Sequence, residues 1–351
     1  MPKKDHWISI HDLVTIRLSD YVGLGERILV PPVRGYSYYV SEMPTTLPDL
    51  DLEIAPFHIT PPPEACWVDR RFIVGSDYFA CEDTSKILWW KVEIRGWESC
   101  SQPTRVRIDR SFVGTVAIGS RLTDCLIRYK LCLKQAPAIH CCGVVSQNGS
   151  GYILSGRSGV GKSTIAMHMM DRGCQLLGDN WVIAHQGQAK SFHLPINIYN
   201  YNVSSSFFQK LPKRLKFDLW WKTYARNLSM GYLKKATHVI LKDVDPDRVA
   251  HCAPLKRVFT FSQGETFLIT MLNRQSGLKR LVANDMMDRD AFHRYMLAYA
   301  SVFPDGVVAN YWQKLHESLS VAIPPEIEFV DVIVPRQITA EHVAEIGKWM
   351  D

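Results

Sequence analysis

The chain has 351 residues, of which 46% are hydrophobic, and a formal net charge of +6, so it is long enough for two globular domains. The modest excess of positive charge suits an anionic ligand such as a nucleotide. Because the basic residues are scattered along the chain, we do not expect nucleic acid as a partner. The chain contains no run of about 18 apolar residues, so neither a membrane span nor a leader is indicated. Its nine cysteines form no C-x-x-C pair, which indicates reduced thiols. We therefore expect a cytoplasmic protein without zinc or membrane partners.

Residues 1–134 are predicted to form a mostly antiparallel β region, because short alternating apolar runs are separated there by turn residues. Among its strands we expect 72–75, 77–81 and 87–94, with a turn at 82–85. A helix over 122–133 follows, since apolar residues recur there at helical spacing. The dense aromatic residues of this region fit the core of a β layer.

Residues 135–351 are predicted to form a nucleotide-binding domain. An apolar strand over 138–145 carries His140, and a hairpin turn over 147–151 leads into a second strand. This strand enters the sequence GRSGVGKS at 156–163, in which four residues separate two glycines and Lys and Ser follow. A helix over 164–172 comes next and is expected to stop at Gly173. Strand, loop and helix in this order are the context of a phosphate-binding loop.

The residue types of this loop have a chemical reason. Glycines let backbone N–H groups turn toward phosphate oxygens, the ammonium of Lys162 adds positive charge, and the hydroxyl of Ser163 can hold Mg²⁺. The residues expected to contact the nucleotide are Gly156, Ser158, Gly159, Val160, Gly161, Lys162, Ser163 and Thr164.

A buried strand over 175–184 is expected to place Asp179 beside the phosphates, where Mg²⁺ or a hydroxyl nucleophile needs a carboxylate. We therefore predict Asp179 as a catalytic residue and, with Ser163, as a metal ligand. The alternative interpretation of Asp179 is a turn or capping residue.

The rest of the chain is predicted from its local patterns. Strands are expected at 192–199, 237–242 and 327–334, and helices at 220–233, 262–272 and 290–301, followed by a last helix that Thr339 caps. The basic cluster formed by Lys210, Lys213, Arg214 and Lys216 is interpreted as a solvated face, with a binding site as the alternative.

The region from Ile139 to Ala184 resembles the HPr kinase/phosphorylase superfamily, whose nucleotide core is related to phosphoenolpyruvate carboxykinase. The matching features are the histidine-led strand, the hairpin into the loop, a short helix ending in Arg172-Gly173 and a strand ending in Asp179-Asn180. The resemblance implies a P-loop core containing a mixed sheet. The predicted mostly-β N-terminal region does not resemble the domain that precedes this core in bifunctional HPr kinases. Together the two parts predict an α/β protein of the α+β kind. The resemblance also implies ATP at the loop, Mg²⁺ on Ser163 and a role for His140 near the transferred phosphate.

The chain departs from the family pattern at Asn180. The family usually has a second aspartate there, and that aspartate is generally assigned as the base. Asparagine cannot take a proton, so either Asp179 is the base, or Asp179 holds the metal while His140 or the surroundings of the substrate assist. The phosphorolytic activity of the family is not expected, and 191–206 contains no acidic residue that could replace the family's later metal-ligand glutamate.

The leading hypothesis is an ATP-dependent, Mg²⁺-assisted kinase with Asp179, His140 and Lys162 as catalytic residues. Its acceptor would be a hydroxyl group, on a serine of a peptide or protein or on a small-molecule alcohol, as in natural-product biosynthesis. The alternative is a catalytically inactive nucleotide-binding protein with a regulatory or assembly role, and simple nucleotide hydrolysis is the weakest interpretation. The sequence leaves open the acceptor, the choice between ATP and GTP, and whether the chain forms a homo-oligomer.

Overall fold

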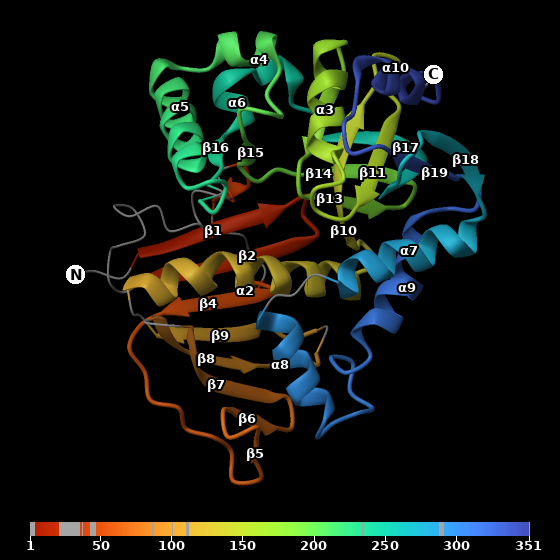
Figure 1. The fold of residues 1–351 in the computed structure, drawn as a ribbon. Coiled ribbons are helices and arrows are strands. Elements are labelled where there is room, and N and C mark those ends of the chain that lie inside the picture. The colour runs from red at the N-terminus through yellow and green to blue at the C-terminus, as the bar shows by residue number, and fades with distance from the viewer. Residues whose placement is uncertain are drawn as a thin grey trace. The chain divides into compact units, whose positions relative to one another are not determined.

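The computed structural model describes residues 4–20, 36, 38–42, 47–85, 88–99, 101–109, 112–233, 235–287 and 291–350 (Figure 1). The chain divides into two compact units, which are Met1–Pro137 with Asp288–Ser318, and Ala138–Met287 with Leu319–Asp351. The sequence placed one boundary, after residue 134. The structure differs in returning the segment 288–318 to the first unit. Both units mix helices with large sheets, as an α+β protein does.

The first unit is built on a mixed sheet, which the described residues form in the order β3-β1-β2-β4-β9-β8-β7-β6-β5. Neighbouring strands are antiparallel as expected, except that β4 runs parallel to both β2 and β9. The strands are β1 Lys4–Ile10, β2 Val14–Asp20, β3 Val40–Ser41, β4 Leu50–Ile54, β5 Cys66–Val68, β6 Phe72–Gly75, β7 Tyr78–Ser85, β8 Leu88–Arg95 and β9 Thr104–Asp109.

The turn predicted at 82–85 is wrong, because these residues continue β7 opposite β8. Glu82 faces Lys91 directly across the two strands, and an ion pair of 3.2 Å joins their side chains. Opposite charges in this position stabilise an antiparallel pair, so the ladder continues past the predicted turn.

Helices α2 (Phe112–Leu133) and α8 (Ala291–Ala300) belong to the first unit, and α2 begins earlier than the sequence predicted. Buried aromatic rings join α8 to the sheet: the ring of Tyr295 lies 4.8 Å from that of Phe79, which lies 5.4 Å from that of Trp97. On α2, the hydroxyl of Tyr129 donates to the carbonyl of Trp97 at 2.9 Å. The aromatic core therefore holds α8 in this unit, although α8 follows the nucleotide core in sequence.

The second unit contains a mixed sheet in the order β11-β10-β13-β14-β17-β19-β18, in which β12 also pairs with β10 and β11 with β17. Strands β11, β17 and β19 are parallel to one another, and the other pairs are antiparallel. The strands are β10 Ala138–Val145, β11 Gly151–Gly156, β12 Gln175–Gly178, β13 Trp181–His185, β14 Gln188–Phe192, β17 Cys252–Gln263, β18 Leu268–Leu272 and β19 Glu328–Val334. A small sheet pairs β15 (Ile196–Ile198) with β16 (Thr237–Val239).

Helices cover both faces of this sheet. Successive side chains of β11 point to opposite faces, so Leu154 packs in the core with Ile165 of α3 while the hydroxyl of Ser155 accepts from the Asn284 amide of α7 at 3.2 Å. The helices of this unit are α3 Lys162–Asp171, α4 Ser205–Lys210, α5 Lys213–Leu228, α6 Leu241–Val244, the 3₁₀ helix η1 Pro246–Arg248, α7 Arg274–Met286 and α10 Ala340–Lys348, and α9 Tyr311–Ala322 runs from the first unit into the second.

The structure confirms the helix after the loop and corrects several neighbouring predictions. Gly173 adopts φ 100°, as expected after the end of α3, and Thr339 caps α10. The helix predicted at 262–272 is wrong: these residues end β17 and form β18, because β17 is buried between two parallel strands and β18 extends the edge. The strand predicted at 175–184 is interrupted between β12 and β13. The run predicted as a strand at 237–242 turns into α6 after β16.

Candidate nucleotide site

The loop between β11 and α3 requires glycine at three places. A Cβ on Gly156 would lie 2.7 Å from the carbonyl oxygen of Phe261, which is closer than Cβ contacts allow. Gly159 and Gly161 have φ values of 88° and 98°, in the left-handed region that glycine adopts without strain. At Gly161 a Cβ would also lie 2.2 Å from Cδ1 of Ile338. The glycine pattern therefore follows from the shape of the loop.

The start of α3 presents backbone donors to the loop. Gly161 is the N-cap and provides no side-chain cap. The N–H groups of Lys162, Ser163 and Thr164 lie in the first turn, where no intrahelical acceptor is available. The side chain of Val160 is buried in the core, so this residue offers an approaching nucleotide its backbone alone. The helix start thus combines unpaired donors with the positive end of the helix dipole.

Lys162 is folded back over the loop. Its side chain is largely buried, and its ammonium donates to the carbonyl oxygens of Gly156 at 2.6 Å and Arg157 at 3.2 Å. Ser158 and Gly159 at the tip of the loop are exposed. The positive charge therefore lies inside the ring of backbone donors, while the tip of the loop is open to solvent.

Asp179 lies in the bend between β12 and β13 and is only 7% exposed. Its carboxylate accepts a hydrogen bond from the thiol of Cys142 at 2.8 Å. The Ser163 hydroxyl and the backbone of Asn197 also lower the pKa of this carboxylate. The Cys142 sulfur lies 3.8 Å from the Ser163 hydroxyl. The fold therefore brings the two predicted metal ligands, Ser163 and Asp179, together beside the Cys142 thiol.

Burial sets the protonation of this cluster. Removal from water raises the pKa of Asp179, and the hydrogen bonds from Cys142 and Ser163 and the charge of Lys162 offset only part of that rise. Burial, together with the neighbouring carboxylate, raises the pKa of Cys142 well above its ordinary value. The thiol is therefore protonated and acts as a donor. The Asp179 carboxylate is a stronger base than an exposed aspartate, as proton abstraction from a hydroxyl requires.

His140 and Asn180 occupy the same neighbourhood with different surroundings. His140 lies two residues before Cys142 on β10, so both side chains are on one face of the strand. The ring of His140 packs on that of Trp181, with 4.9 Å between centroids. The carbonyl of Asn180 accepts from the N–H of Cys141 at 3.1 Å, which fixes the bend after Asp179.

Sequence reasoning missed Cys142 and Asn197. The alternation of β10 could have found Cys142, because the strand that carries His140 must place the side chain two residues later on the same face. Asn197 acts through its backbone N–H. No side-chain pattern could have indicated that contact.

A cavity of about 520 Å³ adjoins the exposed side of the loop. Its polar groups are ordered by local contacts: Arg157 donates to the carbonyl of Asn284 at 3.3 Å, and Arg280 donates to the Thr260 hydroxyl at 3.2 Å and pairs with Asp331. Ligand pockets have volumes of roughly 300–1,000 Å³, so this cavity has room for a small molecule. It is lined by Arg157, Ser158, Gly159, Val160, Thr260, Phe261, Ser262, Gln263, Arg280, Ala283 and Asn284.

The donor set at the start of α3 fits Mg²⁺. Within the described part of the chain, no group of three or more His, Cys, Asp or Glu side chains forms a metal cluster. Mg²⁺ does not require one, because it takes one or two protein oxygens and completes its shell with water and substrate phosphates. The Ser163 hydroxyl and the Asp179 carboxylate are oxygen ligands that both lie beside the Cys142 thiol.

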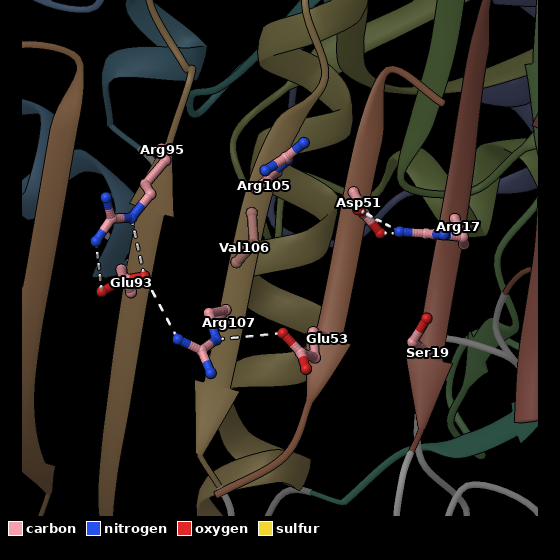
Figure 2. Close-up of a pocket in the computed structure, with 9 residues that line it drawn as sticks. All are labelled: Arg17, Ser19, Asp51, Glu53, Glu93, Arg95, Arg105, Val106 and Arg107. Carbon is pink, nitrogen blue, oxygen red and sulfur yellow. Dashed lines mark hydrogen bonds and ion pairs between the residues drawn. The ribbon is translucent and has the colours of Figure 1, made fainter. Parts of the chain in front are cut away.

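The first unit has a cavity of about 400 Å³ on the charged sheet face, which we define as Arg17, Ser19, Asp51, Glu53, Glu93, Arg95, Arg105, Val106 and Arg107 (Figure 2). Its ion pairs join Arg17 to Asp51 at 2.5 Å, Arg95 to Glu93 at 3.0 Å, and Arg107 to Glu53 at 3.2 Å. Arg105 is exposed and makes no ion pair with any residue that the structure describes. Because carboxylates neutralise most of its cations, we interpret this face as an array that stabilises the sheet.

No family model matches the chain, and no curated protein matches it. Among solved structures it is similar to the Hpr(Ser) kinase/phosphatase from Coxiella burnetii, with 10% sequence identity, a TM-score of 0.29, and coverage of 61% of this chain and 87% of that one. ATP binding, Mg²⁺ and the phosphoryl acceptor stay predictions.

Proposed function

We propose that the chain is an ATP-dependent kinase that transfers the γ-phosphoryl group to a hydroxyl acceptor. The observation that carries this proposal is the buried carboxylate of Asp179 near the first turn of α3, where the Cys142 sulfur lies 2.8 Å from the carboxylate and 3.8 Å from the Ser163 hydroxyl. A loop that only binds phosphate needs glycines and a lysine. A carboxylate of raised pKa beside them supports chemistry at the end of the phosphate chain.

Each group has a role in this reaction. The N–H groups at the start of α3 and the ammonium of Lys162 stabilise the charge of the phosphates. Ser163 would hold Mg²⁺, which when bound neutralises phosphate charge. Asp179 takes the proton of the acceptor hydroxyl while the oxygen of that hydroxyl forms a bond to the γ-phosphorus. The bond between this phosphorus and the β–γ bridging oxygen breaks, which releases ADP. His140, on the same face as Cys142, lies on the side of the sheet from which an acceptor would approach.

The cavity lined by Arg157, Arg280 and Asn284 is our candidate for the rest of the nucleotide. It includes the exposed loop residues Ser158 and Gly159, so a phosphate chain held by the loop is continuous with it. Its volume of about 520 Å³ is large enough for a nucleoside.

A second candidate function is nucleotide binding without phosphoryl transfer, in a regulatory or assembly role. Asn180 favours it, because its side-chain amide cannot take a proton as the second carboxylate of the family pattern would. Both candidate functions require ATP binding, and only the kinase requires turnover of ATP and an acceptor.

The test is Mg²⁺-dependent ADP formation with a panel of serine peptides and small alcohols. We expect Lys162→Ala to lower the rate about 10²–10³-fold, the usual loss for one group that stabilises transition-state charge. The matched control is Lys348→Ala, since Lys348 is an exposed lysine of the same unit whose ammonium pairs with Glu345 on the helix surface. A wild-type rate in Lys162→Ala rejects the kinase. ATP binding by calorimetry without turnover of any acceptor supports the second candidate.

A further inference from the structure

An uncovered row of large apolar side chains runs along α5. This aromatic ridge consists of Phe217, Trp220, Trp221, Tyr224 and Leu228, which are between 50% and 74% exposed. Their spacing of three and four residues places them on one face of the helix. The opposite face packs on the unit through buried Leu219. Contiguous exposed apolar surface of this kind marks an interaction site in a soluble protein.

The ridge is ordered by contacts among its own rings. Phe217 and Trp220 lie 5.8 Å apart between centroids, Trp220 stacks on Tyr224 at 5.9 Å, and Trp221 lies 6.0 Å from Tyr224. The apolar surface continues beyond the helix through Met230 and Tyr232, which are 90% and 91% exposed. The ridge is therefore a convex, preformed apolar surface.

The segment that carries the ridge is strongly basic. Residues 205–235 contain eight Lys or Arg and one acidic residue, so their charge of +7 exceeds the +6 of the whole chain. The acidic residue, Asp218, is bound by Lys222 at 2.6 Å and by the Thr237 hydroxyl at 2.7 Å. Lys213 and Arg214 lie one turn before Phe217, on the same face as the ridge. An apolar surface with this flanking charge is complementary to an anionic partner.

We propose that the aromatic ridge docks the protein on the surface of an anionic phospholipid membrane. Tryptophan and tyrosine are favoured at the boundary between head groups and acyl chains, and basic side chains beside them bind lipid phosphates. Within the part of the chain that the structure describes, no helix is long and apolar enough to cross a bilayer, so the association is peripheral.

The observations favour a membrane over single-stranded nucleic acid. Bases stack on open ring faces, whereas Trp220, Trp221 and Tyr224 stack on each other. The surface also includes the aliphatic side chains of Leu228 and Met230, which insert into lipid and offer nothing to a base. From the sequence we expected no membrane partner, and we interpreted the basic cluster at 210–216 as a solvated face. The exposed aromatic residues beside that cluster are the reason why we now assign both to a membrane-binding surface. The inference does not depend on phosphoryl transfer.

The test is co-sedimentation of the full chain with vesicles of phosphatidylcholine alone and of phosphatidylcholine with phosphatidylserine. We expect the protein to bind the vesicles that contain phosphatidylserine and not those of phosphatidylcholine alone. This binding should weaken as salt is added. The double variant Trp220→Ser/Trp221→Ser should lower the vesicle affinity at least tenfold, on the order of the loss of two interfacial anchors. Lys213→Gln/Arg214→Gln should lower it roughly fivefold per charge removed.

Matched controls come from exposed residues elsewhere. Trp67→Ser removes a tryptophan that is 66% exposed on β5 of the first unit, and it should leave vesicle binding unchanged. Circular dichroism of each variant verifies the fold. The proposal is overturned if the wild type does not bind anionic vesicles at low salt, or if the double tryptophan variant binds them as tightly. A ridge-dependent dimer in size-exclusion chromatography, or ridge-dependent binding of single-stranded DNA without vesicle binding, also overturns it.

Discussion

The charged sheet face of the first unit and the candidate nucleotide site of the second both place cations beside a cavity, but the cations have different partners. On the sheet face, the guanidinium groups of Arg17 and Arg95 are bound by carboxylates. At the nucleotide site, the ammonium of Lys162 is bound by the uncharged carbonyls of Gly156 and Arg157. A cation neutralised by a carboxylate stabilises the fold, whereas a cation held by carbonyls keeps its charge for an incoming anion.

The two regions also each bury one carboxylate. Glu93 is 3% exposed and lies within ion-pair distance of Arg95 and Arg107. Asp179 is 7% exposed and is bound by a thiol, a hydroxyl and a backbone N–H, and its pKa is raised. Guanidinium groups hold the Glu93 carboxylate in ion pairs, whereas neutral donors surround the Asp179 carboxylate, whose pKa is raised by burial. The comparison predicts a structural role for Glu93 and a chemical role for Asp179.

Exchanging each carboxylate for its amide should separate the two roles, with the largest effect on catalysis. We expect Asp179→Asn to lower the rate of phosphoryl transfer by about 10²–10⁴-fold, the range lost with a general base. Glu93→Gln is the matched control and should transfer at the wild-type rate per folded molecule. Equal rates in the two variants, measured as ADP formed with a saturating acceptor, would remove Asp179 from the chemistry.

The same Asp179→Asn variant should show the cost of burying this carboxylate. Since burial raises its folded-state pKa above the ordinary value of 3.8, ionisation of Asp179 opposes folding. That cost is absent below the unfolded-state pKa and complete above the folded-state pKa. The free energy of unfolding of the wild type, relative to the variant, should therefore fall as the pH rises from about 4 to 7. Denaturant titrations at both ends test this, and a pH-independent difference contradicts it.

Glu93→Gln should produce the largest loss of stability on the sheet face. The variant leaves the guanidinium groups of Arg95 and Arg107 without their shared carboxylate and the Tyr78 hydroxyl without a charged acceptor. Removing one partner of a buried ion pair costs about 3–5 kcal/mol, and the partly exposed arginines reduce this to about 2 kcal/mol. Denaturant unfolding measures the loss. A stability within experimental error of the wild type would show that Glu93 is dispensable to the sheet.

Three glycine variants should sharpen the comparison within the second unit. Gly161→Ala combines a φ of 98° with a contact of 2.2 Å to Ile338, whereas Gly159→Ala has a φ of 88° and open space around its Cβ. We expect Gly159→Ala to cost about 1 kcal/mol of stability and Gly161→Ala about 2–3 kcal/mol.

Gly149→Ala provides the control, because Gly149 has a φ of 83° and open space in the hairpin before β11. It should match Gly159→Ala in stability and, unlike it, keep wild-type ATP affinity by calorimetry. Equal ATP affinities in the two variants would show that the loop backbone at 159 does not contact the phosphates.

The smallest effect is expected from Arg105→Gln on the sheet face. Arg105 lies directly opposite Arg95 across β8 and β9, and like charges in that position oppose pairing. The variant should therefore change the free energy of unfolding by no more than about 0.5 kcal/mol, in the stabilising direction. A clear destabilisation in the same denaturant assay would assign Arg105 a structural partner.

Local patterns in the sequence predicted most of the elements around the site. The strand, the loop and α3 follow one another within a short stretch, and Gly173 ends the helix as its position suggested. The prediction was wrong at 262–272, where pairing with β19 decided the conformation: Ser262 and Gln263 end β17 in the parallel pair, and β18 pairs antiparallel with β19 at the edge of the sheet. Residues 175–184 likewise divide at Asp179, because the bend lets β12 and β13 both pair with β10.

The sequence by itself predicted the loop at 156–163, because its glycines, Lys162 and Ser163 express conformational and chemical requirements of a few consecutive residues. Only the tertiary structure decided that Asp179 meets Ser163 and Cys142, and that the rings of α5 stand uncovered beside a basic segment. Contacts between residues far apart in the chain depend on strand register and on which helix face is buried, and a linear pattern contains neither.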